Sequence, residues 1–280
     1  MNMFIHQLLP YLLLLLGMLI GSFLNVVIHR LPLMMQAEWD DETRQEPVSI
    51  INLWWPPSHC PVCKANIKPW DNIPVLSWLL LKGKCRGCHH PIPFFYPLSE
   101  AIIGCCFFLL ALFCSATHSW PWIGSIALFL CILYTLALID IRTCLLPDSL
   151  VFMLLWSGLL ASVLGIIPVS PRDAVIGAVM AWGLTAAMTK AYYWLRRKEG
   201  FGQGDIKLFA AVSVWLGYQA VPALLLLSAL LGAGIYVFCW FYFCKILGES
   251  KNIFLAQGHY LPFGPAIALA AVILLYLQGA

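Results

Sequence analysis

Charged residues are what this sequence has least of. Only 10% of its 280 residues are Asp, Glu, Lys or Arg, and 61% are hydrophobic. Soluble domains carry about 25% charged residues and roughly 45–50% apolar ones. A water-soluble fold of this size cannot cover so much apolar surface, so the composition excludes a soluble globular protein and predicts an integral membrane protein.

The apolar residues also lack the alternating pattern of membrane β-barrel strands. They form continuous runs instead, and because lipid cannot satisfy backbone polar groups, each run must be a helix. We therefore predict an all-α polytopic membrane protein with about eight transmembrane helices. Seven runs have the length that spans a bilayer, at 8–28, 98–117, 121–139, 149–167, 174–194, 222–244 and 261–278, and a shorter one lies at 205–219.

The N-terminus lacks a basic n-region and a small-residue cleavage site, so we interpret the first run as a retained span and not a signal peptide. The connections between predicted helices alternate in charge. Every second connection is nearly free of basic residues, and Arg172 is the one basic residue assigned to these connections. By the positive-inside rule both termini lie outside and residues 30–97 lie in the cytoplasm. The basic residues assigned to the inside are Arg30, Arg44, Lys64, Lys68, Lys82, Lys84, Arg86, Arg142, Arg196, Arg197, Lys198, Lys245 and Lys251.

The predicted cytoplasmic segment has two halves. The first, QAEWDDETRQEP, is acidic, and we expect it to be solvated and loosely ordered. The second holds two CxxC pairs, Cys60 with Cys63 and Cys85 with Cys88, separated by 21 residues. Four thiolates at this spacing can surround one zinc ion and leave no open coordination position, which favours a structural zinc site.

Two disulfides are the alternative use of these cysteines. The segment is expected in a reducing compartment, where disulfides are rare, so zinc is favoured. Histidines close enough in sequence to replace one cysteine as a ligand are His59, His89 and His90.

Acids are absent from the middle of the apolar runs and stand at their ends. Asp148 follows Pro147 and precedes an apolar run, so it fits a helix N-cap. Asp140 ends a span, where the helix dipole disfavours a negative charge. Capping therefore explains Asp148 but does not explain Asp140.

Asp205 begins the short apolar run. A helix N-terminus accommodates an acid, but three glycines precede this one, which is more backbone freedom than a cap needs. They permit a close backbone approach or closure of the segment over a substrate. The glycines are Gly200, Gly202 and Gly204.

Asp140 and Asp205 are predicted at the same membrane depth. Two such carboxylates can share one proton, so that one acts as acid and the other as base, and such a pair can activate water against a peptide bond. A purely structural acid network is the alternative. Lys207, two residues after Asp205, can lower the pKa of a neighbouring carboxyl or extend to the membrane interface.

The same lack of mid-membrane acids argues against the main alternative from another class. An ion- or metal-coupled membrane transporter with a zinc-stabilised cytoplasmic domain would place acids near the bilayer midplane. A non-enzymatic assembly scaffold is a third hypothesis, and it would need no acid pair.

Several stretches together resemble the prepilin peptidases, also called type IV leader peptidases, over nearly the whole chain. GxGD alone would be a weak signal, but the combination is highly specific. The stretches are GSFLNVVIHRLP (21–32), PPSHCPVC (56–63), NIPVLSWLLLKGKCRGC (72–88), YPLSE (96–100), IDIRTCLLPD (139–148), GFGQGDIKLFAA (200–211) and LPFGP (261–265).

The resemblance implies a bifunctional enzyme of the bacterial inner membrane, with both termini periplasmic. It implies cleavage of type IV prepilin or pseudopilin leaders after a glycine at the cytoplasmic face, with Asp140 and Asp205 as the catalytic acids. It also implies methylation of the new N-terminal amine with S-adenosylmethionine as donor. The expected partners are these precursors and the lipid bilayer, with no nucleic acid.

The implied domains are a first transmembrane helix at 1–29, a methyltransferase-associated zinc-binding domain at 30–97 and a peptidase domain at 98–280. The sequence lacks a nucleotide-type glycine loop, so it does not place the S-adenosylmethionine site. Asn25, Glu100 and the GSFLN turn are candidates to contribute to methyl transfer.

Overall fold

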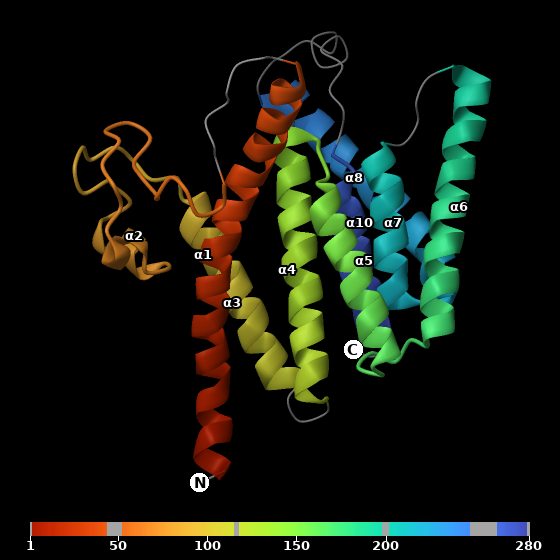
Figure 1. The fold of residues 1–280 in the computed structure, drawn as a ribbon, viewed down its shortest axis with the longest axis horizontal. Helices are drawn as coiled ribbons and strands as arrows, with labels where there is room; N and C mark the ends of the chain where they lie inside the picture. The colour runs from red at the N-terminus through yellow and green to blue at the C-terminus, as the bar shows by residue number, and fades with distance from the viewer. Residues whose placement is uncertain (1, 44–51, 115–117, 198–201, 247–261, 279–280) are drawn as a thin grey trace. The chain divides into compact units, whose positions relative to one another are not determined.

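The computed structural model describes residues 2–43, 52–114, 118–197, 202–246 and 262–278 (Figure 1). Within these ranges the chain is helical, with two isolated β-bridges and no strand, which confirms the predicted all-α class. It divides into two compact units, Met1–Ala127 and Leu128–Ala280, which we describe separately.

Five helices are long and apolar enough to cross a membrane by length and composition. Three further helices, α5 (Asp148–Val163), α7 (Gln203–Leu216) and α10 (Gly264–Leu277), fall on predicted spans but are shorter. The five candidate spans lie on α1 (Asn2–Thr43), α3 (Phe95–Cys114), α4 (Trp120–Thr143), α6 (Pro171–Arg196) and α8 (Val221–Ile246) with the 3-10 turn η2 (Tyr218–Ala220) before it.

In the first unit, α1 packs closely on α3. A Cβ on Gly17 would lie 2.9 Å from Cα of Gly104, and a Cβ on Gly21 would lie 2.9 Å from Cα of Glu100. Glycine is therefore required where the two backbones approach, as small residues are in membrane helix pairs. This contact holds the YPLSE stretch against the GSFLN stretch.

The acidic stretch predicted to be loosely ordered is helical in its described part. Helix α1 continues to Thr43, through the first eight residues of QAEWDDETRQEP, and the rest lies outside the described residues. The prediction was wrong for residues 36–43. Gln, Ala, Glu and Met are good helix formers, so propensity carries the helix beyond the apolar run.

The cysteine-containing segment is short turns around two small helical pieces, η1 (Pro69–Asn72) and α2 (Leu76–Leu80). Trp78 makes two contacts within this segment. Its indole N–H donates to the Ile92 carbonyl at 3.1 Å, and its ring packs edge-on against that of Phe94, with the ring centroids 5.6 Å apart. Gly83, with φ +68°, allows the chain to fold back over this ring. These contacts fix the segment between the two CxxC pairs.

In the second unit, α7 is the central helix, and 10 of its 14 residues are buried. It contacts α5, α6 and α10. The Trp215 indole donates to the Leu154 carbonyl of α5 at 2.9 Å, and its ring lies 4.9 Å from that of Phe129 on α4. At Gly158 a Cβ would come within 2.5 Å of this indole. Helix α7 is therefore held from several sides, with Asp205 in its first turn.

Candidate functional site

The four cysteines of the two CxxC pairs lie together in the first unit. Their sulfur atoms are all within 4.8 Å of one another, and no histidine belongs to the cluster among the described residues. Cys60 Sγ lies 3.7 Å from Cys88 Sγ, and Cys63 Sγ lies 3.9 Å from Cys85 Sγ. A disulfide needs about 2.05 Å, whereas tetrahedral zinc with bonds of ~2.3 Å separates its sulfurs by ~3.8 Å. The arrangement fits a four-thiolate metal site.

Both CxxC turns have the same backbone geometry. Lys64 and His89, which follow the second cysteine of each pair, have left-handed φ values of 58° and 56°. Their amides donate to the carbonyls of Cys60 and Cys85 at 2.9 and 3.0 Å. Because the turns match, each pair presents its thiols in the same way to a shared centre.

Backbone amides favour the thiolate form of two of the four cysteines, whereas at Cys88, despite the His90 amide, burial and the neighbouring thiols raise the pKa to about 11. The amides of Cys63 and Val62 lower the pKa of the Cys60 thiol to about 6. The amides of Cys88 and Gly87 lower the pKa of the Cys85 thiol in the same way. Because thiolates are the metal-binding form of cysteine, these amide contacts prepare Cys60 and Cys85 to bind a cation.

Asp140 lies near the end of α4 and is buried, with 4% of its surface exposed. Its Oδ2 accepts a hydrogen bond of 2.7 Å from the backbone amide of Gly264, the first residue of α10. The N-terminus of a helix presents free amides and partial positive charge to an anion. The dipole of α4 disfavours a negative charge on Asp140, but the N-terminus of α10 stabilises that charge.

Asp205 is the third residue of α7 and is partly buried. The backbone amide of Gly202, the N-cap residue, donates to its carboxylate. An acid at this position that reaches back to the N-cap amide stabilises a helix start. Gly204 serves a different purpose, since a Cβ there would lie 3.0 Å from Leu146 Cβ. Gly200 lies outside the described residues.

Asp140 contacts the start of α10, and α10 packs against α7, which carries Asp205. The two carboxylates are close enough for the negative charge of Asp140 to act on Asp205. The ring of Phe263, directly before Gly264, lies 6.2 Å from that of Phe209 on α7 and links α10 to α7 beside them. Two close carboxylates resist simultaneous ionisation, so such a pair can hold one proton and act as general acid and general base.

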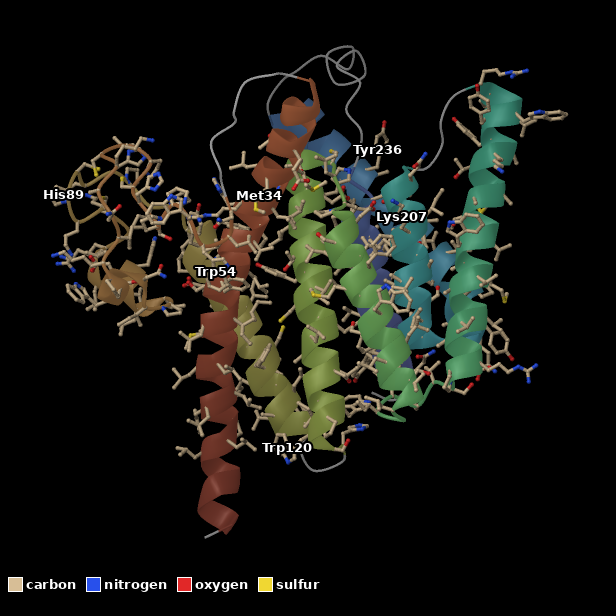
Figure 2. All side chains as sticks on the ribbon, in the orientation of Figure 1. Met34, Trp54, His89, Trp120, Lys207 and Tyr236 are labelled. Atoms are coloured by element: carbon tan, nitrogen blue, oxygen red, sulfur yellow. The ribbon has the colours of Figure 1, made fainter. Side chains whose placement is uncertain are left out.

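The predicted N-cap role of Asp148 is wrong. Pro147 is the N-cap of α5, it provides no side-chain bond, and Asp148 is the first helical residue. Its carboxylate oxygens instead accept from Nζ of Lys207, both at 2.7 Å. Lys207 projects from α7 (Figure 2). This ion pair connects α5 with α7.

Gly264 is the site residue that the sequence reasoning did not assign. It lies in the LPFGP stretch, and Pro265 after it marks a helix start, because proline is favoured in the first helical turn. That signal predicts free amides at Gly264, but it does not indicate which acid they contact. A Cβ on Gly264 would lie 2.8 Å from Oδ2 of Asp140, so only glycine allows this approach.

The candidates for methyl transfer lie at the contact of α1 with α3. Glu100 is buried, and its carboxylate accepts from the Val75 amide at 2.8 Å and from the Ser22 hydroxyl. The side-chain amide of Asn25 donates to the Tyr96 carbonyl at 3.3 Å. Glu100 thereby connects the helix pair with the cysteine-containing segment.

Comparison with known proteins matches both parts of the chain. Residues 15–114 match the family described as the bacterial peptidase A24 N-terminal domain, and residues 127–237 match the type IV leader peptidase family. The chain is 42% identical over 275 residues to the prepilin leader peptidase/N-methyltransferase of Aeromonas hydrophila, covering 92% of this chain and 87% of the relative.

Two further relatives carry the same name. That of Pectobacterium carotovorum subsp. carotovorum is 39% identical, over 94% of this chain and 91% of the relative. That of Neisseria gonorrhoeae is 37% identical, over 92% of this chain and 87% of the relative. No solved structure matches the chain.

Proposed function

The chain belongs to the type IV leader peptidase family, and on that premise we propose that it is both a prepilin peptidase and an N-methyltransferase. It cleaves the leader peptide of type IV prepilins and pseudopilins after a glycine at the cytoplasmic membrane face. It then methylates the new N-terminal residue. The observation that best supports the peptidase activity is the pair of acids Asp140 on α4 and Asp205 on α7. The start of α10 binds Asp140.

We assign Asp140 and Asp205 as the catalytic acids. One carboxylate takes a proton from a water molecule as it attacks the scissile carbonyl, and the other gives its proton to the carbonyl oxygen or leaving amine. The amide of Gly264 keeps Asp140 in one orientation, which favours a defined attack geometry. The helix start after Gly202 gives Asp205 its position.

The peptidase proposal is tested by processing of a prepilin in membranes that contain the full-length protein. Asp140→Asn and Asp205→Asn should each abolish cleavage. Asp148→Asn is the matched control, because Asp148 is also an acid at a helix end but binds Lys207. Cleavage retained in Asp205→Asn would refute the assignment.

The four-cysteine cluster is proposed to hold one structural zinc ion through Cys60, Cys63, Cys85 and Cys88. Four thiolates fill a tetrahedral shell, so this ion would have no open position for catalysis. The expected role is to fold the domain at residues 30–97, which we associate with methyl transfer. Residues 98–280 form the peptidase domain in this division, after a first helix at 1–29.

S-adenosylmethionine is the proposed methyl donor, and its sulfonium supplies an activated methyl group. The chain is a multi-pass protein of the bacterial inner membrane, consistent with its five apolar helices. We propose that the shorter α5, α7 and α10 complete a set of about eight membrane helices, with both termini periplasmic. The alternative of an ion- or metal-coupled transporter finds no support among the relatives.

A further inference from the structure

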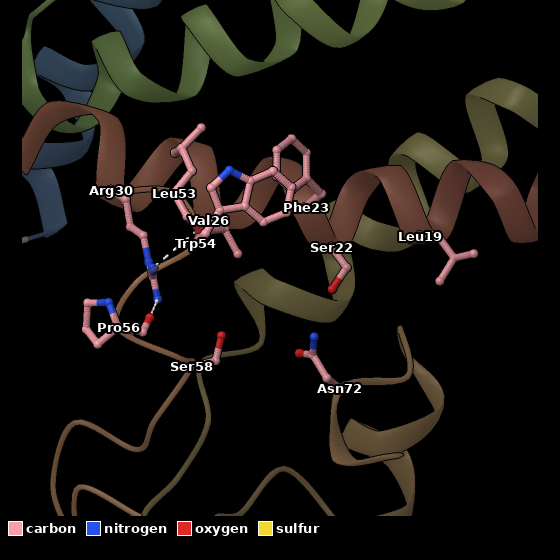
Figure 3. Close-up of a pocket in the computed structure, with 10 residues that line it drawn as sticks. All are labelled: Leu19, Ser22, Phe23, Val26, Arg30, Leu53, Trp54, Pro56, Ser58 and Asn72. Atoms are coloured by element: carbon pink, nitrogen blue, oxygen red, sulfur yellow. Dashed lines mark hydrogen bonds between the residues drawn. The ribbon is translucent and has the colours of Figure 1, made fainter. Parts of the chain in front are cut away.

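A cavity of about 280 Å³ lies in the first unit between α1 and the chain around residues 53–72 (Figure 3). Small-molecule sites usually begin near 300 Å³, so the cavity lies at the lower limit of this range and a ligand larger than that would extend beyond it. Neither the four cysteines nor the acid pair lines it. Its lining combines an aromatic wall with several polar side chains.

The aromatic wall is formed by Phe23 of α1 and Trp54. Their ring centroids lie 6.0 Å apart with an angle of 30° between the planes. Trp54 is 80% exposed, so one face of its indole is available to a ligand. Aromatic faces attract flat heterocycles by stacking and attract onium cations through their quadrupole.

The polar part of the cavity comes from Ser22, Ser58 and Asn72, whose side chains point into the same space (Figure 3). Hydroxyl and amide groups both donate and accept hydrogen bonds, as the recognition of a ribose or an amino-acid end requires. Arg30 adds a positive charge at the wall, which suits a carboxylate.

The cavity wall is held in place by two anchors. The Arg30 guanidinium donates to the carbonyls of Asn52, Leu53 and Pro56, at 3.0, 3.3 and 2.6 Å, and so fixes the segment that carries Trp54. The buried Glu100 accepts from the Ser22 hydroxyl behind the opposite wall. A cavity fixed in this way is preformed for its ligand.

We propose that this cavity is the site of the methyl donor, S-adenosylmethionine. The Trp54 and Phe23 rings would hold its adenosyl sulfonium, and Ser22, Asn72 and Arg30 would bind its polar ends. The donor combines a flat heterocycle, an onium cation, hydroxyl groups and a carboxylate, which are the chemistries that the lining offers. The inference rests on the proposed methyltransferase function.

The test is equilibrium dialysis of radiolabelled S-adenosylmethionine against the purified full-length protein in detergent. Trp54→Ala removes the stacking surface and Val26→Phe fills part of the cavity, so each should weaken binding at least about tenfold. Trp55→Ala is the matched control, because Trp55 is the exposed neighbour of Trp54 but does not line the cavity. Its binding should stay near that of the unchanged protein.

Two further measurements locate the donor and check the fold. Ultraviolet cross-linking of the bound label, followed by peptide mapping, should mark a peptide that contains Trp54 or Phe23. Zinc content and leader cleavage should be unchanged in all three variants, which separates loss of the site from loss of the fold.

The inference is overturned if Trp54→Ala and Val26→Phe bind the donor as tightly as the unchanged protein. In that case the donor site lies elsewhere and the methyltransferase function stands. It is also wrong if a peptide beginning with phenylalanine cross-links to Trp54 and the donor does not. If the unchanged protein neither binds the donor nor methylates its cleaved product, the proposed methyltransferase function fails as well.

Discussion

The backbone amide of Gly264 donates a 2.7 Å hydrogen bond to Oδ2 of Asp140, although 124 residues separate them in sequence. The bond places a buried carboxylate at the N-terminus of α10. A helix N-terminus is a natural anion site because its first amides have no partner within the helix. Asp140 is thus oriented by backbone, which side-chain motion cannot easily disturb.

Gly264→Ala should therefore impair cleavage. Its Cβ would lie 2.8 Å from Oδ2 of Asp140, so the carboxylate must move, and misplacement of a catalytic group by about 1 Å can cost roughly 10²-fold in rate. Gly183→Ala on α6 is the matched control, since its Cβ would meet nothing within 4 Å. The measurement is the rate of prepilin cleavage, and equal rates in the two variants would contradict this role of Gly264.

The acid pair should behave as one unit. Asp140→Asn and Asp205→Asn should each abolish cleavage, and the double variant should be no worse, because residues that act together are not additive. The rate of cleavage against pH should be bell-shaped, with two apparent pKa values that belong to the pair. A double variant that loses much more than either single one would speak against a shared-proton mechanism.

The ion pair of Asp148 with Lys207 should contribute little stability and no catalysis. Both side chains are well exposed, 53% and 37%, and such pairs are worth about 0.2–1 kcal/mol. Asp148→Asn and Lys207→Met should each lower the thermal midpoint slightly, and the double variant should lower it by less than their sum. Cleavage should persist in all three; its loss in Asp148→Asn would give this acid a role that we do not assign.

The cysteine cluster should bind about one zinc ion per chain, measured by elemental mass spectrometry of the purified protein. Cys60→Ser or Cys85→Ser should lose the metal and destabilise the segment around it while the membrane helices remain folded. Cys105→Ser on α3 is the control, because Cys105 is outside the cluster. Undiminished zinc in the quadruple serine variant would refute the site.

Glu100→Ala should separate the two activities. It leaves the Val75 amide without its acceptor, at a cost of about 1–3 kcal/mol, and frees Ser22 at the cavity wall. We expect cleaved but poorly methylated product, detected by mass spectrometry of the mature substrate. Glu38→Ala, at an exposed position on α1, should methylate normally. Full methylation in Glu100→Ala would remove this residue from the methyl-transfer region.

The sequence alone was sufficient for the membrane class, the approximate positions of the helices and the two CxxC pairs. Hydrophobicity is a local property that any span must have, and the CxxC turn is set by adjacent residues. The dipole argument also singled out Asp140, because it needs only the direction of the helix that carries the acid, but the N-cap assignment of Asp148 was wrong. It could not say what stabilises Asp140.

Tertiary packing determined which groups bind the acidic side chains. Lys207 reaches Asp148 across 59 residues, and Gly264 reaches Asp140 across 124, so no local pattern predicts either pair. The extension of α1 to Thr43 was also missed, because the end of an apolar run marks where lipid contact ends and not where a helix ends. The cavity beside Trp54 is lined by Arg30 and Pro56, which are 26 residues apart and are joined by a hydrogen bond. The apolar composition of a helix is a property of its own residues. Contacts between helices depend instead on how closely their backbones approach, and only the folded chain determines that distance.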